Sequence, residues 1–287
     1  MLRRRCLTIS LLLICVLLVF SFASCNKAGT DGTSQNQTTG QSETQSQAGG
    51  TLKRVQETKK LVLGTSADYP PYEFHKLIDG KDKIIGFDIA IAEVIAQELG
   101  AELEIRDMDF GGLLMALQEG KVDIVIAGMT PKPERMEQVD FTKIYYTAAQ
   151  GVVIRAEDKD KYKTADDLKG HKVGAQMGAI QEDIAKEQIP GSEVKALAKV
   201  SDLVLELKNK KVDALVMEKP VANAYIDANP DLALSEIEVV DDTGGSAIAI
   251  AKGNEDFVEK LNSILDNLIN TGKIDQFVTD AINQVGD

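Results

Sequence analysis

The sequence of 287 residues contains no tryptophan and only two histidines, His75 and His171. A catalytic zinc site usually takes about three protein ligands rich in histidine, so no metal centre is expected. The sequence has neither G-x-x-x-x-G-K-[ST] nor G-x-G-x-x-G, so no nucleotide-binding unit and no cofactor are indicated. Positive charge is also in deficit, since 32 Lys and Arg stand against 45 Asp and Glu. Nucleic acid binding needs clustered basic residues, so no nucleic acid partner is expected.

Cysteine is scarce and confined to the N-terminus, at Cys6, Cys15 and Cys25. Three arginines at residues 3–5 precede an almost wholly apolar stretch at residues 7–22. A basic segment followed by an apolar one is the order of a secretory signal peptide. The apolar stretch is short for a spanning helix, which needs about 20 residues.

The stretch FASC at residues 22–25 ends this segment and resembles a bacterial lipobox, in which the cysteine is lipidated and becomes the mature N-terminus. Phe22 stands where leucine is usual, and ordinary cleavage or an uncleaved signal anchor stays open. We predict a lipoprotein signal peptide over residues 1–24 and lipidation of Cys25. The protein would then be extracytoplasmic and lipid-anchored to the outer face of the cell membrane, and its folded part would contain no disulfide.

Residues 26–50 consist mainly of Gly, Ser, Thr, Gln and Asn. Such a composition cannot bury enough apolar surface to offset the entropy of ordering. The sequence therefore predicts a flexible polar tether, which we place at residues 25–58.

Apolar strand-like stretches alternate with helical patterns after the tether. The spacing predicts a helix over residues 87–99, with Ile89, Val94, Ile95 and Leu99 on one stripe and Gly100 ending it. A second helix is predicted at residues 113–118, and strands at residues 61–64, 103–106 and 122–127. This alternation is typical of an α/β protein with a mainly parallel sheet and helices on both faces.

Residues 117–124 and 207–214 share a pattern, in which a helix end is followed by Lys-Val-Asp and an apolar strand. Two similar α/β lobes would explain the repeat, although convergent use of a common turn would too. Ligands of open α/β sheets bind beyond the carboxyl ends of the strands. Four segments lie there, at residues 66–74, 128–135, 176–182 and 217–221.

Ordered motifs across residues 60–281 resemble those of the extracytoplasmic polar-amino-acid-binding proteins of ABC transporters, the family 3 solute-binding proteins. They include GTSADYPPYEF at 64–74, IGFDIA at 85–90, IAGMTPKPER with VDFTKIYY at 126–146, VGAQMGAIQE at 173–182 and EKPVA at 218–222. The resemblance implies the type II periplasmic binding fold, two doubly wound lobes joined by two hinge strands. We expect a first lobe at residues 59–149, a second at 150–245 and a return to the first at 246–287, with hinge crossings near residues 148–154 and 244–251.

The resemblance implies that Arg135 holds the carboxylate of a bound amino acid through a bidentate pair. The alternative is that Arg135 pairs with Glu134 or Glu137 on a surface helix. Thr130 would donate to the ligand and the Gly128 carbonyl would accept from its ammonium, although Thr130 could also serve as a turn or helix cap.

In the second lobe, the backbone amides of Gly178, Ala179 and Ile180 would point at the carboxylate from a helix N-terminus. The family usually has hydroxyl residues where Ala179 and Ile180 stand, so only backbone donation is expected there. Glu218, where the family more often has Asp, would pair with the ammonium, or would be a solvated loop carboxylate. The implied site also includes Met129 and Gln181.

The ligand side chain would stack on Tyr69 and Phe110, or Phe110 would belong to the core. Ser66 occupies a position that is often Asp in binders of basic amino acids, which counts against a cationic ligand. Asp68 and Glu73 could supply the missing negative charge, and their loop is similar to that of arginine and lysine binders.

We therefore expect a monomeric substrate-binding lipoprotein, not an enzyme, that captures a polar amino acid, most readily arginine or lysine, and passes it to an ABC permease with its ATPase subunits. Glutamine or another polar amino acid stays open as the ligand. A second alternative is an enzyme of the cyclohexadienyl dehydratase type on the same fold, with Glu218 or Glu73 as its acid. A third is a ligand-sensing pair of lobes.

Overall fold

The structure is a computed structural model that describes residues 50–242 and 244–286. The predicted signal peptide, Cys25 and residues 26–49 lie outside the described residues. No helix within the described ranges has the length and apolar composition needed to cross a membrane.

The first lobe is built on a five-stranded sheet in the order β5-β1-β6-β13-β7. Its strands are β1 (Lys60–Thr65), β5 (Glu102–Asp107), β6 (Ile124–Val125), β7 (Val139–Tyr146) and β13 (Ser246–Ala251). β1 pairs parallel with β5 and β6, whereas β13 pairs antiparallel with β6 and β7. A smaller sheet, β2-β3-β4, comprises Asp68–Tyr69, Glu73–Ile78 and Lys81–Ile85. The helices of this lobe are α1 (Thr51–Thr58), α2 (Phe87–Leu99), α3 (Leu113–Gln118), α4 (Pro133–Met136), α8 (Glu255–Asn270) and α9 (Lys273–Gly286), with the short 3-10 helix η1 (Phe110–Gly112).

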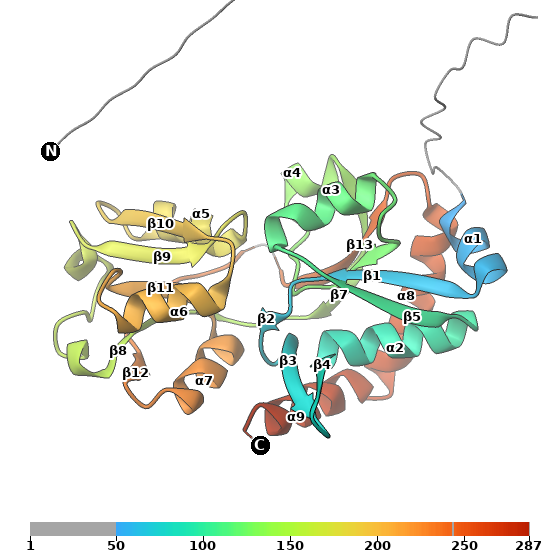
Figure 1. Cartoon of the computed structure of the whole chain (residues 1–287). Coiled ribbons are helices and arrows are strands. Elements are labelled where there is room, and N and C mark those ends of the chain that lie inside the picture. The colour runs from blue at the N-terminus through green and yellow to red at the C-terminus, as the bar shows by residue number, and fades with distance from the viewer. Residues whose placement is uncertain (1–49, 243, 287) are drawn as a thin grey trace, which may run out of the picture. The chain divides into compact units, whose positions relative to one another are not determined.

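The second lobe has a five-stranded sheet in the order β10-β9-β11-β8-β12. Its strands are β8 (Gln150–Arg155), β9 (Lys172–Gln176), β10 (Glu193–Leu197), β11 (Ala214–Glu218) and β12 (Leu232–Leu234). Its helices are α5 (Ile180–Gln188), α6 (Val200–Lys208) and α7 (Lys219–Ala228), with the 3-10 helices η2 (Ala156–Asp158) and η3 (Ala165–Leu168). The chain enters this lobe between β7 and β8 and leaves it between β12 and β13 (Figure 1). The predicted class, two α/β lobes joined by two crossings, is confirmed.

Helix α2 spans the predicted residues 87–99 and ends at Gly100, which adopts the left-handed conformation. Its core face differs in detail from the prediction, because Ile91 is fully buried whereas Val94 is half-buried. Gly86 precedes the helix with φ 132°, and a Cβ there would lie 2.1 Å from the carbonyl oxygen of Tyr72. This close approach lets the backbone amide of Asp88 donate to that oxygen at 3.0 Å.

Two expectations differ from the structure. The tether predicted at residues 25–58 is wrong over its last turns, because Thr51–Thr58 form α1. Val55 of that helix is fully buried in the core, and the amide of Thr51 donates to Asn254 Oδ1 at 3.0 Å. The strand predicted at residues 122–127 is regular only over Ile124–Val125, although all six residues are buried.

Replacing Gly86 with alanine should destabilise the fold by at least about 2 kcal/mol, because the new Cβ collides with backbone atoms that cannot move independently. Gly80→Ala is the matched control, since Gly80 also has positive φ but no atom lies within 4 Å of its Cβ position. That control should cost about 1 kcal/mol. Urea unfolding of both variants measures the difference, and equal losses would show that the contact at Gly86 relaxes freely.

Candidate functional site

A small cavity lies between the two lobes and is lined by most of the residues that the sequence singled out. Eight of the thirteen predicted ligand-binding residues line it: Tyr69, Phe110, Gly128, Thr130, Arg135, Ala179, Ile180 and Gln181. Gln176, from the expected segment at residues 176–182, and Ala127, which lies outside the four expected segments, complete the lining. The first-lobe residues lie at the end of β2, in η1 and after β6, and the second-lobe residues lie at the end of β9 and in the turn and helix that follow it. The cavity therefore lies where the strand-end rule places a ligand.

Arg135 reaches across the cleft from α4. Its Nη1 donates to the carbonyl oxygen of Thr130 and its Nη2 to that of Gly178, both at 2.8 Å. The guanidinium lies 5.2 Å from the ring centroid of Phe110, a cation–π distance. Burial lowers the pKa of Arg135 to about 10, while Asp183 and Glu134 act in the opposite direction.

The alternative role for Arg135, an exposed ion pair with a neighbouring glutamate, is not what the structure has, since the residue is only 5% exposed. A guanidinium has five N–H donors, so the two carbonyl contacts leave donors for an anion in the cavity. Phe110 satisfies both of its expected roles, because it packs in the core and also lines the cavity.

The turn before α5 differs from the prediction. The amide of Gly178 donates to Glu182 Oε2 at 2.9 Å, and that of Ala179 donates to the Gln176 carbonyl at 3.2 Å. Two of the three amides expected to face a carboxylate are therefore already engaged. Gln181 instead spans the cleft, with its Nε2 3.1 Å from Gln150 Oε1 and 3.4 Å from the Tyr69 hydroxyl.

Three other residues of the sequence argument lie elsewhere. Ser66 lines a larger groove beside the cavity. Met129 is 1% exposed and packs in the core. Asp68, expected to supply charge for a cationic ligand, instead accepts at Oδ2 from the amides of Val200 and Ser201 at 2.5 and 3.3 Å. Asp68 thus caps the N-terminus of α6 across the cleft, and the Tyr225 hydroxyl donates to its carbonyl at 2.8 Å.

Glu73 is completely buried in β3, and neither of its carboxyl oxygens has a hydrogen-bond donor. Asp88 lies within hydrogen-bonding reach of it, and burial followed by this neighbouring charge raises the pKa of Glu73 well above its ordinary value. Asp88 Oδ2 accepts from the Gly128 amide at 2.8 Å and from the Tyr145 hydroxyl at 2.9 Å. Burial raises the pKa of Asp88 to about 6, against the effect of those two donors.

Glu218 supplies a third buried carboxyl, from the second lobe. It is 3% exposed, so the alternative of a solvated loop carboxylate is wrong. The hydroxyl of Tyr72 donates to its Oε2 across the cleft. Burial raises the pKa of Glu218 to about 8, although the Tyr72 hydrogen bond opposes the shift.

Asp88, Tyr72 and Tyr145 are parts of this acidic cluster that the sequence did not predict. Asp88 lies in the IGFDIA motif and in the helix predicted over residues 87–99, but neither pattern assigns it a role in the site. A signal was available, because an aspartate next to Phe87 and Ile89 on the apolar stripe is unusual unless a buried partner holds it. The two tyrosines carried no such signal.

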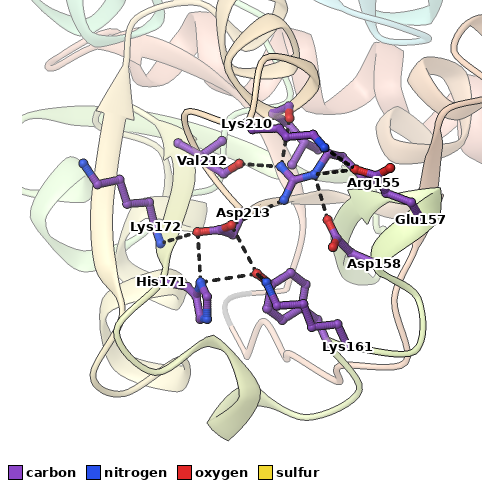
Figure 2. Close-up of polar contacts among 11 residues, drawn as sticks. Arg155, Glu157, Asp158, Lys161, His171, Lys172, Lys210, Val212 and Asp213 are labelled. Atoms are coloured by element: carbon purple, nitrogen blue, oxygen red, sulfur yellow. Dashed lines mark hydrogen bonds and ion pairs between the residues drawn. The ribbon is translucent and has the colours of Figure 1, made fainter.

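A polar network at the far end of the second lobe offers a comparison (Figure 2). There the buried Arg155 pairs with Asp158 at 2.7 Å and with Asp213 at 3.3 Å. Burial would raise the pKa of Asp213, but hydrogen bonds from the Lys172 amide, His171 and Tyr162 hold it below its ordinary value. Lys161 lies beside Asp158 and Asp213, and Lys210 pairs with Glu157, so three basic side chains meet three acidic ones in this network. In contrast, no lysine or arginine of the described residues donates to Glu73, Asp88 or Glu218.

A two-lobed α/β fold with an interlobe cavity that is lined by one arginine, and with three buried acids near it that have no basic partner among the described residues, is the arrangement of a receptor for a small polar solute. The model of the bacterial extracellular solute-binding proteins, family 3, matches residues 61–283, and the chain belongs to this family.

The chain is 40% identical over 221 residues to the arginine-binding extracellular protein ArtP of Bacillus subtilis. The alignment covers 76% of this chain and 84% of that protein. It is 33% identical over 210 residues to the ABC transporter arginine-binding protein 1 of Escherichia coli, over 72% of this chain and 84% of that protein. Among solved structures, the substrate-binding protein AbpA of Streptococcus pneumoniae bound to L-arginine matches with a TM-score of 0.79 and 35% identity, over 82% of this chain and 99% of that one.

These relatives are transport proteins, so the expectation that the chain is a solute-binding protein and not an enzyme is confirmed. The same family membership makes it an extracytoplasmic component of an amino acid ABC transporter. The dehydratase alternative gains nothing from them.

Asp68 does not line the cavity. The variant Asp68→Ala should nevertheless weaken ligand binding about tenfold, because two charge-assisted hydrogen bonds that hold the lobes together are lost. Calorimetry with arginine and with citrulline, which keeps the shape of arginine without its charge, measures the loss. If Asp68 only holds the lobes together, the affinities for both ligands should fall by the same factor. A selective loss of arginine affinity would show that Asp68 senses the charge of the ligand. Asp227→Ala, an exposed change on α7, is the control.

Proposed function

We propose that this protein captures a cationic amino acid, arginine ahead of lysine, in the interlobe cavity and delivers it to an ABC permease. The observation that carries the choice of ligand is the group of three buried carboxyls beside the cavity, none of which has a basic partner among the described residues. Burying uncompensated carboxyls is costly, and a cationic ligand would remove that cost. The arginine-binding relatives support the same choice.

The α-carboxylate of the ligand would bind Arg135 through the guanidinium donors that the Thr130 and Gly178 carbonyls leave unused. Thr130, which is 2% exposed, lines the same end of the cavity and could donate its hydroxyl. The amides of Ile180 and Gln181, in the first turn of α5, would contribute the positive end of the helix dipole. The ammonium would pair with Glu218 and with the Gly128 carbonyl.

The side chain of the ligand would extend between Tyr69 and Phe110 towards Glu73. Tyr69 pairs with Glu73 in the β2–β3 register, so the aromatic ring and the carboxyl lie on neighbouring strands. A guanidinium suits this end of the cavity, because it stacks on an aromatic face and also forms hydrogen bonds with a carboxylate. Glutamine could stack there but would leave Glu73 without a counter-charge.

The protein would work as a monomer held at the membrane by a lipid on Cys25, in partnership with a permease and its ATPase subunits. The basic, apolar and small-residue order of residues 3–25 supports the lipid anchor. Residues 59–149 and 246–287 would form one lobe and residues 150–245 the other. Closure of the lobes would give affinity, because ligand contacts come from both at once.

Arg135→Ala should lower arginine affinity by two to three orders of magnitude, since removing one partner of a buried charge pair costs roughly 3–5 kcal/mol. Calorimetry against the twenty amino acids identifies the ligand first, and the same titration is then repeated with the variant. Arg106→Ala, a partly exposed change on β5, should leave the affinity unaltered. A loss of tenfold or less in Arg135→Ala would place this residue outside the binding site.

Cys25→Ser should release the protein from the membrane or leave the precursor uncleaved, because serine offers no thiol to lipidate. Fractionation of cells that express the wild type and the variant measures the distribution, and the mass of the mature N-terminus reports processing. Cys15→Ser lies within the predicted signal peptide and serves as the control. A normally processed Cys25→Ser protein that stays with the membrane would refute the lipid anchor.

A further inference from the structure

Glu73 and Asp88 are two buried acids whose side chains lie within hydrogen-bonding reach of each other. Glu73 is 0% exposed on β3 and Asp88 is 0% exposed in the first turn of α2. Asp88 Oδ2 has two donors, the Gly128 amide and the Tyr145 hydroxyl, whereas Asp88 Oδ1 and both oxygens of Glu73 have none. Two carboxylates cannot form a hydrogen bond to each other without a proton between them, so this contact requires at least one protonated partner.

The groups that face the pair from the elements around it are acids and phenols. Asp68 and Tyr69 face it from β2, Tyr145 from β7 and Glu218 from β11. Tyr72 lies between Tyr69 and Phe87, with ring centroids 5.3 and 4.3 Å away, and directs its hydroxyl at Glu218. Asp241 contributes a further negative charge at Glu218. Of these groups, the carboxyls of Asp68 and Glu218 oppose a second negative charge on the pair, whereas the Tyr145 hydroxyl stabilises a single charge on Asp88.

We propose that Glu73 and Asp88 share a proton and release it to solvent when a cationic side chain binds, so that the preference for a cationic over a neutral amino acid increases with pH. This inference rests on the proposed function, because it takes the arginine side chain to end beside Glu73. In the exchange one carboxyl O–H bond breaks, the proton passes to water, and the ligand guanidinium takes over the hydrogen bonds and the charge balance. A neutral ureido or amide group would instead accept a hydrogen bond from the protonated pair.

Asp88 is the positioning residue in this pair. The Gly128 amide and the Tyr145 hydroxyl fix Oδ2, whereas Oδ1 has no donor. Gly128 itself lines the cavity, and a Cβ there would lie 3.4 Å from the rings of Tyr69 and Tyr72. The carboxyl pair therefore lies directly behind the cavity wall, close enough to respond to the charge of the ligand without Asp88 touching it.

Calorimetry in buffers of different ionisation enthalpy counts the protons released by arginine and by citrulline between pH 5 and pH 8. Both ligands carry the ammonium that would pair with Glu218, so any proton from Glu218 cancels in the comparison. Arginine should release about one proton more than citrulline at the acidic end. The ratio of the two affinities should then rise about tenfold per pH unit and level off where the free pair has lost its proton.

Asp88→Asn should remove the excess proton and flatten the ratio against pH, while arginine still binds. The amide oxygen can keep the Gly128 and Tyr145 hydrogen bonds, and the amide nitrogen can donate to Glu73 and favour its ionised form without a ligand. Glu98→Gln, an exposed change on the same helix, should behave as the wild type. If Asp88→Asn fails to fold, the wild-type proton count decides by itself.

Equal proton counts for arginine and citrulline in the wild type, or an affinity ratio that changes less than twofold between pH 5 and pH 7, would overturn the shared proton. Tight arginine binding under those conditions would leave the proposed function intact. Absence of arginine binding at every pH would overturn both.

Discussion

The burial of negative charge between the two lobes is the constraint on which the rest of this structure depends. A carboxyl removed from water must gain a cation, gain hydrogen-bond donors or keep its proton. In the second lobe three basic side chains, Arg155, Lys161 and Lys210, face three acidic ones, so that network needs no counter-charge from outside (Figure 2). At the cleft, neither Glu73 nor Glu218 has a basic partner among the described residues, and the polar side chains that stabilise the charge of Glu218, those of Tyr72 and Gln150, are neutral. The difference separates a structural network from a binding site.

The sheet topology explains how these acids come together although the sequence separates them by 145 positions, from Glu73 to Glu218. Glu73 begins β3, Asp88 lies in the first turn of α2 and Glu218 ends β11. Gly86 accepts a conformation that other residues avoid and so brings the N-terminus of α2 against the loop that carries Tyr72. Tyr72 then reaches the second lobe at Glu218. Local backbone geometry therefore sets the charge distribution in the cleft.

The sequence predicted the elements with strong local signals and missed the contacts that depend on the folded state. Helix α2 has clear periodicity and ends at Gly100, and its bounds were correct. Helix α1 has only Thr51 and Val55 buried in a polar stretch, so its composition alone indicated a tether. The family motifs placed Arg135 and Thr130 at the cavity. They did not predict that the Asp68 carboxylate caps α6, because this contact depends on the position of the second lobe.

Some contacts across the cleft only join the two lobes, whereas other polar groups lie close to the cavity. Asp68 at α6, and Lys132 with Asp183 at 2.7 Å, join the lobes without lining it. Their loss would change the fraction of closed molecules and so affect every ligand by a similar factor. In the proposed binding mode, Glu73 and Asp88 both belong to the first lobe and would act on the side-chain end of the ligand. Lobe closure and charge preference would then be carried by different residues, so that sequence change could adjust one of them while the other is preserved.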